Sequence, residues 1–162
     1  MFHVAGVTPE AELMDHSITE TLPLGRERVA GALSSLGSSE APLGAVSVGT
    51  PHASVNELET LARHCVGLKT SVPFYVNAGR DVLGRAGDAV EVLERFGATI
   101  VTDTCTYITP ILGDVRGAVM TNSGKWAYYA PANLGVDVVM GTLADCVESA
   151  ASGRTIVRGV PT

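Results

Sequence analysis

The sequence contains little charge, few aromatic residues and no long hydrophobic run. Only 17% of its 162 residues are charged, against about 25% in a typical soluble domain. Aromatic residues make up 5%, and 11 Lys and Arg are outnumbered by 17 Asp and Glu, with no basic cluster. The chain therefore lacks the basic patch and the aromatic stacking surfaces that nucleic-acid-binding proteins use. No apolar run approaches the roughly 20 residues of a membrane-spanning helix, so we expect neither a nucleic acid nor a membrane as partner.

Cysteine is also scarce. The three cysteines are Cys65, Cys105 and Cys146, an odd number at wide spacing, which is a poor disulfide framework. The N-terminus lacks the cationic segment and cleavage site of a secretory signal. We therefore expect a cytoplasmic protein whose cysteines are packed, reactive or metal-bound rather than bridged. No CxxC pair, Walker loop or Gly-x-Ser-x-Gly motif is present, which excludes the common zinc, P-loop and serine-hydrolase signatures.

Hydrophobic residues are plentiful, at 46% with a mean hydropathy of +0.26, so a packed core is expected. Short β-rich runs alternate with helical stretches, which is typical of a parallel sheet covered by helices on both faces. We predict one domain over residues 1–162, a three-layer α/β/α fold with a mostly parallel sheet. The expected strands are 3–7, 45–48, 72–76, 99–102, 118–120 and 136–140. The expected helices are 9 to about 18, 26–36, 54–65, 77–96, 126–130 and 143–152.

Small polar segments follow most of these strands. They are Gly-Thr-Pro-His at 49–52, Asn-Ala-Gly-Arg at 77–80, Asp-Thr-Cys at 103–105, Thr-Asn-Ser-Gly-Lys at 121–125 and Gly-Thr at 141–142. Parallel sheets of this kind bind ligands outside the carboxyl ends of their strands, and free N–H groups at helix N-termini bind carboxylate or phosphate. The sequence therefore predicts an anion-binding cleft along this edge.

The residues at these exits leave several roles open. Cys105 lies among polar neighbours, which fits a metal ligand or nucleophile as well as a small buried residue. Cys146 lies near a helix start that favours a thiolate, yet by itself it is more typical of a core residue. His52 could bind an anion or move protons, or satisfy loop carbonyls. Lys125 and Arg80 lie near helix starts, where a cation is disfavoured unless it faces a bound anion.

Several motifs together resemble the aconitase X family. They are Val101-Thr-Asp-Thr-Cys105, Met120-Thr-Asn-Ser-Gly-Lys-Trp-Ala-Tyr-Tyr-Ala-Pro131 and Asp145-Cys146-Val147, supported by residues 2–10 and 49–54. The resemblance extends over nearly the whole chain with similar gaps. It covers only the later part of that family's large catalytic polypeptide, and we expect the earlier part to be absent from this chain.

The resemblance implies an iron–sulfur hydro-lyase, which eliminates water from a small hydroxy acid such as cis-3-hydroxy-L-proline or a phosphorylated mevalonate. It makes Cys105 and Cys146 cluster ligands, and we expect the third cysteine ligand and the catalytic base outside this chain. It also makes pocket residues of Thr50, His52, Asn122, Ser123 and Lys125, although Asn122 and Ser123 are by default ordinary helix caps.

The expected partners are the N-terminal half of the large subunit and a small swivelling subunit or domain. The alternative functions are a non-catalytic anion-binding or small-molecule-binding module, and one piece of a split enzyme whose other half is a separate chain.

Overall fold

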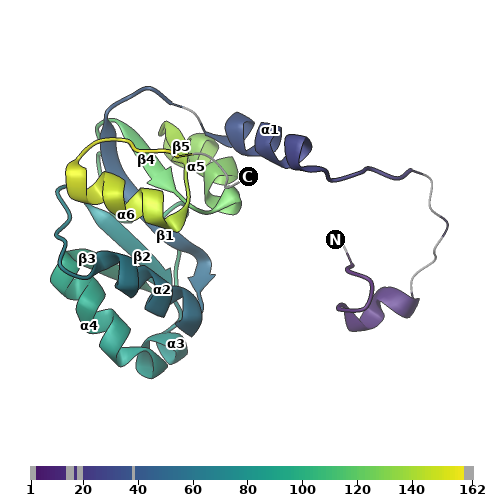
Figure 1. Ribbon diagram of the computed structural model, residues 1–162, viewed down its shortest axis with the longest axis horizontal. Coiled ribbons are helices and arrows are strands. Elements are labelled where there is room, and N and C mark those ends of the chain that lie inside the picture. Colours follow the sequence, from purple (N-terminus) through teal and green to yellow (C-terminus); the bar gives the residue numbers. More distant parts are fainter. Residues whose placement is uncertain (1–2, 14–16, 18–19, 38, 159–162) are drawn as a thin grey trace.

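Five parallel strands form one sheet at the centre of the structure, a computed structural model that describes residues 3–13, 17, 20–37 and 39–158. The order across the sheet is β3-β2-β1-β4-β5 (Figure 1). The strands are β1 (Leu43–Ala53), β2 (Phe74–Ala78), β3 (Ala98–Thr102), β4 (Ala118–Thr121) and β5 (Val138–Met140). Because every neighbouring pair is parallel, all the carboxyl ends meet at one edge.

Helices cover both faces of this sheet, which confirms the predicted α/β/α layering. One face carries α2 (Val55–Cys65), α4 (Gly87–Phe96) and α6 (Leu143–Ser152), with the short α3 (Arg80–Arg85) beside them (Figure 1). The other face carries α5 (Gly124–Leu134) and the connection between β3 and β4, which includes the short 3-10 helix η2 (Pro110–Leu112). The helix α1 (Arg26–Leu36) packs against β5 and α5.

Alternation along the strands assigns each side chain to one of the two faces. In β1, Val46 and Val48 join the apolar cluster under α2, α4 and α6, whereas Ala45 joins the cluster under α5. Phe74 and Phe96 meet edge to face in the first cluster, with ring centroids 5.2 Å apart. Burying a side chain of this size contributes roughly 1.5–3 kcal/mol, so the two clusters hold the three layers together.

Local capping sets several helix ends. Ser54 and Glu57 form a capping box at the start of α2: the Ser54 N–H donates to Oε2 of Glu57 at 2.8 Å, and the Glu57 N–H donates to Oγ of Ser54 at 3.3 Å. A second box joins Thr142 and Asp145 at the start of α6. Gly153, expected as the end of the last helix, takes a left-handed conformation (φ 70°) there.

The prediction for the N-terminal segment was wrong. Residues 3–7 form no strand. The N–H groups of Val7 and Thr8 both donate to the carbonyl of Val4 instead, at 3.0 and 2.8 Å. A five-residue 3-10 helix, η1 (Pro9–Leu13), replaces the first part of the expected helix, and residues 14–16 and 18 lie outside the described residues. The segment lies apart from the sheet (Figure 1), and within the described part of the chain no strand lies beside it to pair with it.

Other boundaries differ from the prediction as well. The strand expected at 45–48 runs over Leu43–Ala53, so the polar segment 49–52 lies within β1 rather than after it, and α5 is longer than the expected 126–130. The stretch 77–96 contains two helices, α3 and α4, because the chain breaks at Ala86 between them. Asn77 and Ala78 belong to β2 rather than to a helix. Each difference arises because strand pairing and helix packing, rather than local propensity, decide how far an element runs.

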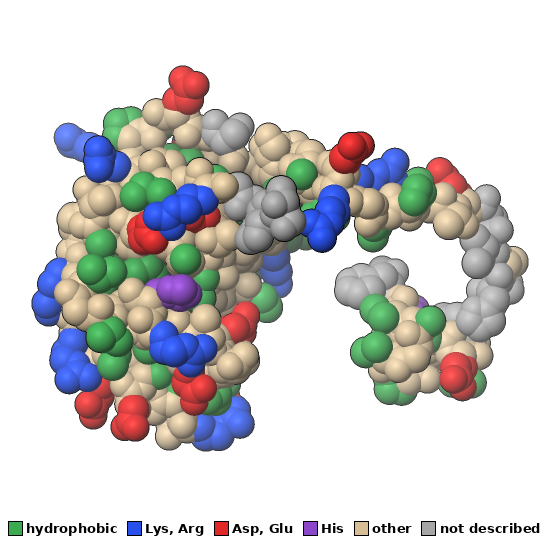
Figure 2. All heavy atoms as spheres, viewed as in Figure 1, with side chains coloured by type: hydrophobic (Ala, Val, Ile, Leu, Met, Phe, Trp, Pro, Cys, Tyr) green, Lys and Arg blue, Asp and Glu red, His purple; other side chains and the backbone are tan. Residues whose placement is uncertain are grey.

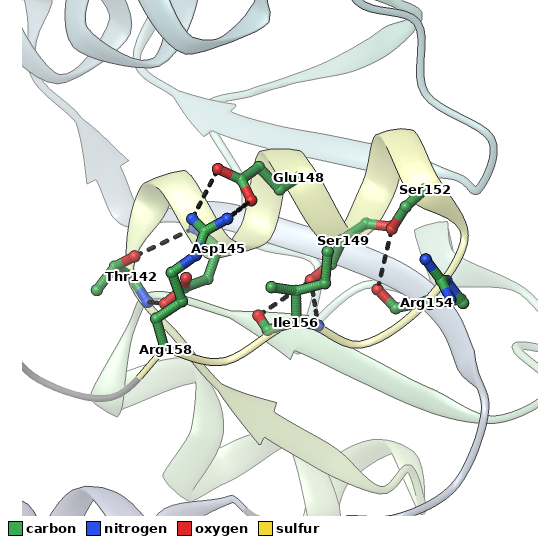
Figure 3. A network of polar contacts seen from close by, with 8 residues as sticks. All are labelled: Thr142, Asp145, Glu148, Ser149, Ser152, Arg154, Ile156 and Arg158. Carbon is green, nitrogen blue, oxygen red and sulfur yellow. Dashed lines mark hydrogen bonds and ion pairs between the residues drawn. The ribbon is translucent and has the colours of Figure 1, made fainter.

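The segment after α6 folds back along that helix (Figure 3). The Ile156 N–H donates to Oγ of Ser149 at 2.8 Å, and this hydroxyl donates to the Ile156 carbonyl at 3.2 Å. The Arg158 guanidinium forms an ion pair with Glu148, with Nη1 and Oε1 2.7 Å apart. Arg158 lowers the pKa of the Glu148 carboxyl by hydrogen bonding. Among the described residues, no helix has the length and apolarity needed to cross a membrane.

Candidate functional site

The sheet has a topological switch point between β1 and β4. These strands are neighbours, but β1 continues into α2 on one face and β4 continues into α5 on the other. Open α/β sheets bind ligands in the crevice outside the carboxyl ends of two such strands. Thr50 and His52 lie in the last part of β1, and Asn122 and Ser123 follow β4 directly. The fold therefore places these predicted pocket residues at the carboxyl ends of two neighbouring strands, the edge where a ligand crevice is expected and which we call the crevice.

A buried polar network anchors this edge. The Asn77 side chain donates through Nδ2 to the Val48 carbonyl at 2.9 Å, and its Oδ1 accepts from the Thr106 N–H at 3.2 Å. The Thr106 hydroxyl is 2.7 Å from Oγ of Ser47 and accepts from Nε1 of Trp126 at 2.8 Å. The side chains of Ser47, Asn77, Thr106 and Trp126 are fully buried. A fully satisfied buried network of this kind is rigid, so it fixes the segment after β3 against β1, β2 and α5.

Cys105 lies next to Thr50 at this edge. Sγ of Cys105 is 3.3 Å from the Thr50 hydroxyl, which in turn accepts from Nδ2 of Asn77 at 3.3 Å. Because Asn77 donates to the Thr50 oxygen, the Thr50 hydroxyl proton is free to be donated to the Cys105 sulfur. The structure thus brings together two residues that are 55 positions apart in the sequence.

His52, Arg80 and Asp103 form the outer rim of the crevice. The Arg80 N–H donates to Oδ1 of Asp103 at 2.9 Å, and the Arg80 guanidinium pairs with the same carboxylate. These contacts, the backbone hydrogen bond first, lower the pKa of Asp103, and His52 adds a smaller electrostatic contribution. Asp103 has a left-handed backbone (φ 57°), an unusual conformation for a residue other than glycine. A Cβ added at Gly79 would lie 3.9 Å from Nδ1 of His52 and 4.0 Å from Oδ1 of Asp103.

The β4 side of the crevice contains Asn122, Ser123 and Lys125. The Ser123 hydroxyl caps α5 by accepting from the Trp126 N–H at 3.2 Å, so its default role as a cap is present. Oδ1 of Asn122 is buried and, among the described residues, has no hydrogen-bond partner. Lys125 is exposed in the first turn of α5, where its ammonium group and the helix N-terminus can act on the same anion.

The other two cysteines lie away from this crevice. Cys146 is fully buried in the apolar cluster under α6, on the face opposite to Cys105. Burial, together with the neighbouring Asp145 carboxylate, raises the pKa of the Cys146 thiol well above its usual range. Cys65, at the end of α2, belongs to the same cluster, and burial raises its pKa to about 12.

An iron–sulfur cluster is therefore not held by this chain's cysteines as a group. Within the part of the chain that the structure describes, no three His, Cys, Asp or Glu side chains are grouped so that they could hold a metal. Cys105 alone combines a thiol with a position at the strand exits. Among the described residues, the three cysteines are not placed to bind a common cluster.

Sequence reasoning missed the network beneath Cys105. The sequence places Asn77 in the polar segment 77–80 and assigns no role to Ser47 or Thr106, whereas in the structure Ser47 and Asn77 lie within strands. A signal was present, since Ser47 and Asn77 are polar residues at positions of apolar strands where β-propensity favours other residues. A buried polar side chain in a central strand requires partners, and here these partners are the residues that position the candidate site.

Comparison with known proteins gives matches to one protein family. Residues 43–152 match the protein family described as aconitase X third domain. The chain is 38% identical over 167 residues to the cis-3-hydroxy-L-proline dehydratase of Pseudomonas aeruginosa, covering 96% of this chain and 29% of that protein. It is 32% identical over 155 residues to the phosphomevalonate dehydratase large subunit of Methanosarcina mazei, covering 95% of this chain and 38% of that subunit.

The fold is similar to a solved structure as well. The crystal structure of Thermococcus kodakaraensis aconitase X in its holo-form matches with a TM-score of 0.71 and 27% sequence identity, covering 90% of this chain and 38% of that chain. The present chain thus spans 29–38% of the length of these three relatives.

Proposed function

The chain belongs to the aconitase X family, and we propose that it forms part of a hydro-lyase that eliminates water from a small hydroxy acid. The observation that carries the proposal is the 3.3 Å contact between the Thr50 hydroxyl and the Cys105 sulfur at the carboxyl edge of the sheet, in a chain whose residues 43–152 match the third domain of this family. We propose that the whole chain corresponds to this one domain. Three free cysteines are consistent with the cytoplasmic location that we also propose.

The proposed role of this chain is to bind and orient the substrate. In the elimination, a hydroxyl group leaves one carbon and a proton leaves the neighbouring carbon. The substrate carries a carboxylate or phosphate, which the Lys125 ammonium and the N–H groups at the start of α5 are suited to hold. We propose Thr50, His52, Asn122 and Ser123 as further residues around the substrate, and a base outside this chain as the group that removes the proton.

The proposed cofactor is an iron–sulfur centre to which this chain contributes a minority of the ligands. Cys105 is the stronger candidate because it lies at the crevice and 3.3 Å from a hydroxyl group. Cys146 as a second ligand stays a prediction, because its thiol is fully buried on the opposite face. Anaerobic iron and sulfide reconstitution of this chain alone should give no stable, stoichiometric absorbance from iron–thiolate bonds. A stable cluster on this chain alone would refute the proposal that ligands are missing.

The substrate is expected to resemble those in the names of the relatives, cis-3-hydroxy-L-proline or phosphomevalonate. The test is to co-express this chain with the part of the Pseudomonas aeruginosa dehydratase that lies outside the match, and to assay water elimination from each compound. Activity in the complex, absent from either part alone, is the expected result. A stable complex that is inactive on both compounds would refute the proposed reaction.

A second candidate is a binding module without catalysis. The lack of a grouped metal-ligand set among the described residues favours it, since the crevice would still hold an anion. This function predicts that Cys105→Ser leaves the binding of cis-3-hydroxy-L-proline or phosphomevalonate to this chain unchanged, as measured by calorimetry. A lack of detectable binding to the unsubstituted chain would refute it.

A further inference from the structure

The two faces of the molecule differ in charge. Between residues 104 and 136, which form the β3–β4 connection, β4 and α5, only Asp114, Arg116 and Lys125 carry charge. The helices on the opposite face are rich in charged residues, and Figure 2 shows Lys, Arg, Asp and Glu side chains spread over that face. A solvated face normally carries charge, whereas the centre of an interface is depleted of it. The shortage of charged residues in this chain is thus greatest on the face that carries α5.

Large apolar and aromatic side chains are exposed on this uncharged face. Ile108 is 68% exposed, Tyr128 67% and Tyr129 46%. The Tyr129 ring stacks on Tyr107 with centroids 5.8 Å apart and meets Tyr128 edge to face at 5.0 Å. Mutual ring contacts preorganise these side chains, and tyrosine is among the residues that contribute most to binding at interfaces. We call Ile108, Tyr128 and Tyr129, with the uncharged segments 104–113 and 126–136, the tyrosine surface.

The tyrosine surface is connected to the candidate site through the chain and through buried side chains. Its first segment contains Cys105 and Thr106, and its second begins at Trp126, whose Nε1 donates to the Thr106 hydroxyl at 2.8 Å. Among the described residues, no group of potential metal ligands surrounds the Cys105 thiol, and under the proposed function a polypeptide docked here would supply the further ligands.

We propose that the tyrosine surface docks the remaining domains of an aconitase X large subunit. The proposal rests on the proposed function, because it assigns the surface to the completion of the same site. Three observations select this occupant over a second copy of the chain. The chain matches a domain described as the third of its family, and its relatives are about three times as long. A second copy would bring the same incomplete set of ligands.

The test uses co-purification with a tagged partner. The partner is the part of the Pseudomonas aeruginosa cis-3-hydroxy-L-proline dehydratase that lies outside its match to this chain, co-expressed with each variant. The test variant carries both Ile108→Lys and Tyr128→Lys, and the matched control is Val66→Lys. Val66 is equally exposed, at 68%, but follows α2 on the charged face. All three substitutions are at exposed positions, so circular dichroism and the fluorescence of the buried Trp126 should match those of the unsubstituted chain.

The expected result is a one-to-one complex for the unsubstituted chain and for Val66→Lys, with binding at least about 10-fold weaker for the double variant. Equal binding by all variants would overturn the proposal, as would no complex with any of them. Dimers of this chain alone that the double variant abolishes would identify a second copy as the occupant and would also overturn it. A complex that depends on Ile108 and Tyr128 but lacks dehydratase activity would leave the docking surface standing and refute the proposed function alone.

Discussion

Replacing Asn77 by alanine should destabilise the fold and loosen the candidate site together. Asn77 is fully buried, and its side chain satisfies the Thr106 N–H and donates to the Val48 carbonyl. Alanine leaves the Thr106 N–H without an acceptor, which costs about 1–3 kcal/mol, and removes the bond to Val48, worth about 1 kcal/mol. We therefore expect a loss of about 2–4 kcal/mol in the free energy of unfolding.

Urea unfolding followed by Trp126 fluorescence measures this loss. Trp126 is the only tryptophan of the chain and is fully buried, so its emission reports both global unfolding and the state of the network. The matched control is Asn56→Ala, at an exposed position in the first turn of α2, where we expect a change within about 0.5 kcal/mol.

The Asn77 variant should also expose Cys105. Asn77 fixes Thr50 on one side of the thiol and the Thr106 backbone on the other, so its removal should raise the rate of Cys105 alkylation under native conditions. If Asn77→Ala had the same urea unfolding midpoint as Asn56→Ala and an unchanged rate of Cys105 alkylation, the view that this network positions the crevice would be refuted.

Three further predictions follow from the structure. Gly49→Ala should lower the free energy of unfolding by about 2–4 kcal/mol, because its φ is 84° and an added Cβ would lie 2.5 Å from a backbone oxygen. Gly67→Ala, at φ 75° but in open space, should lower it by only about 1–2 kcal/mol. Equal losses would contradict this reasoning. Iodoacetamide at pH 8 should alkylate Cys105 at least about 10-fold faster than Cys146, since burial disfavours the Cys146 thiolate. Peptide mass spectrometry measures the two rates, and comparable rates would show that α6 opens readily. Because the pKa of Glu148 is lowered from 4.5 in the folded state, its carboxylate stabilises the fold above about pH 4.5 and less as the pH falls through the lower folded value. The stability difference between the unsubstituted chain and Glu148→Gln should therefore shrink between pH 5 and pH 3, and a constant difference would refute the contribution of the ion pair.

Local sequence signals were sufficient to predict the bounds of several helices. The helices at Arg26–Leu36 and Leu143–Ser152 have the boundaries that their sequences predict, and α2 begins within one residue of its expected start, where Ser54 and Glu57 form a capping box. Caps and terminal glycines act through hydrogen bonds and backbone angles within a few residues, so the sequence itself contains the information. The same reasoning failed at residues 3–7, since a strand exists only where another strand pairs with it.

The sequence by itself determined the alternation of strands and helices, the edge where polar residues gather and the family to which these motifs belong. Only the tertiary structure decided which of these residues meet. Cys105 and Cys146 look alike in sequence, as thiols near strand exits, yet they lie on opposite faces because their segments cover different sides of the sheet. Asn77 became part of the candidate site for the same reason, since only the pairing of β1 with β2 places its amide beside Thr50 and the Thr106 backbone. Such contacts join residues about 30 to 60 positions apart, and local periodicity contains no information about them.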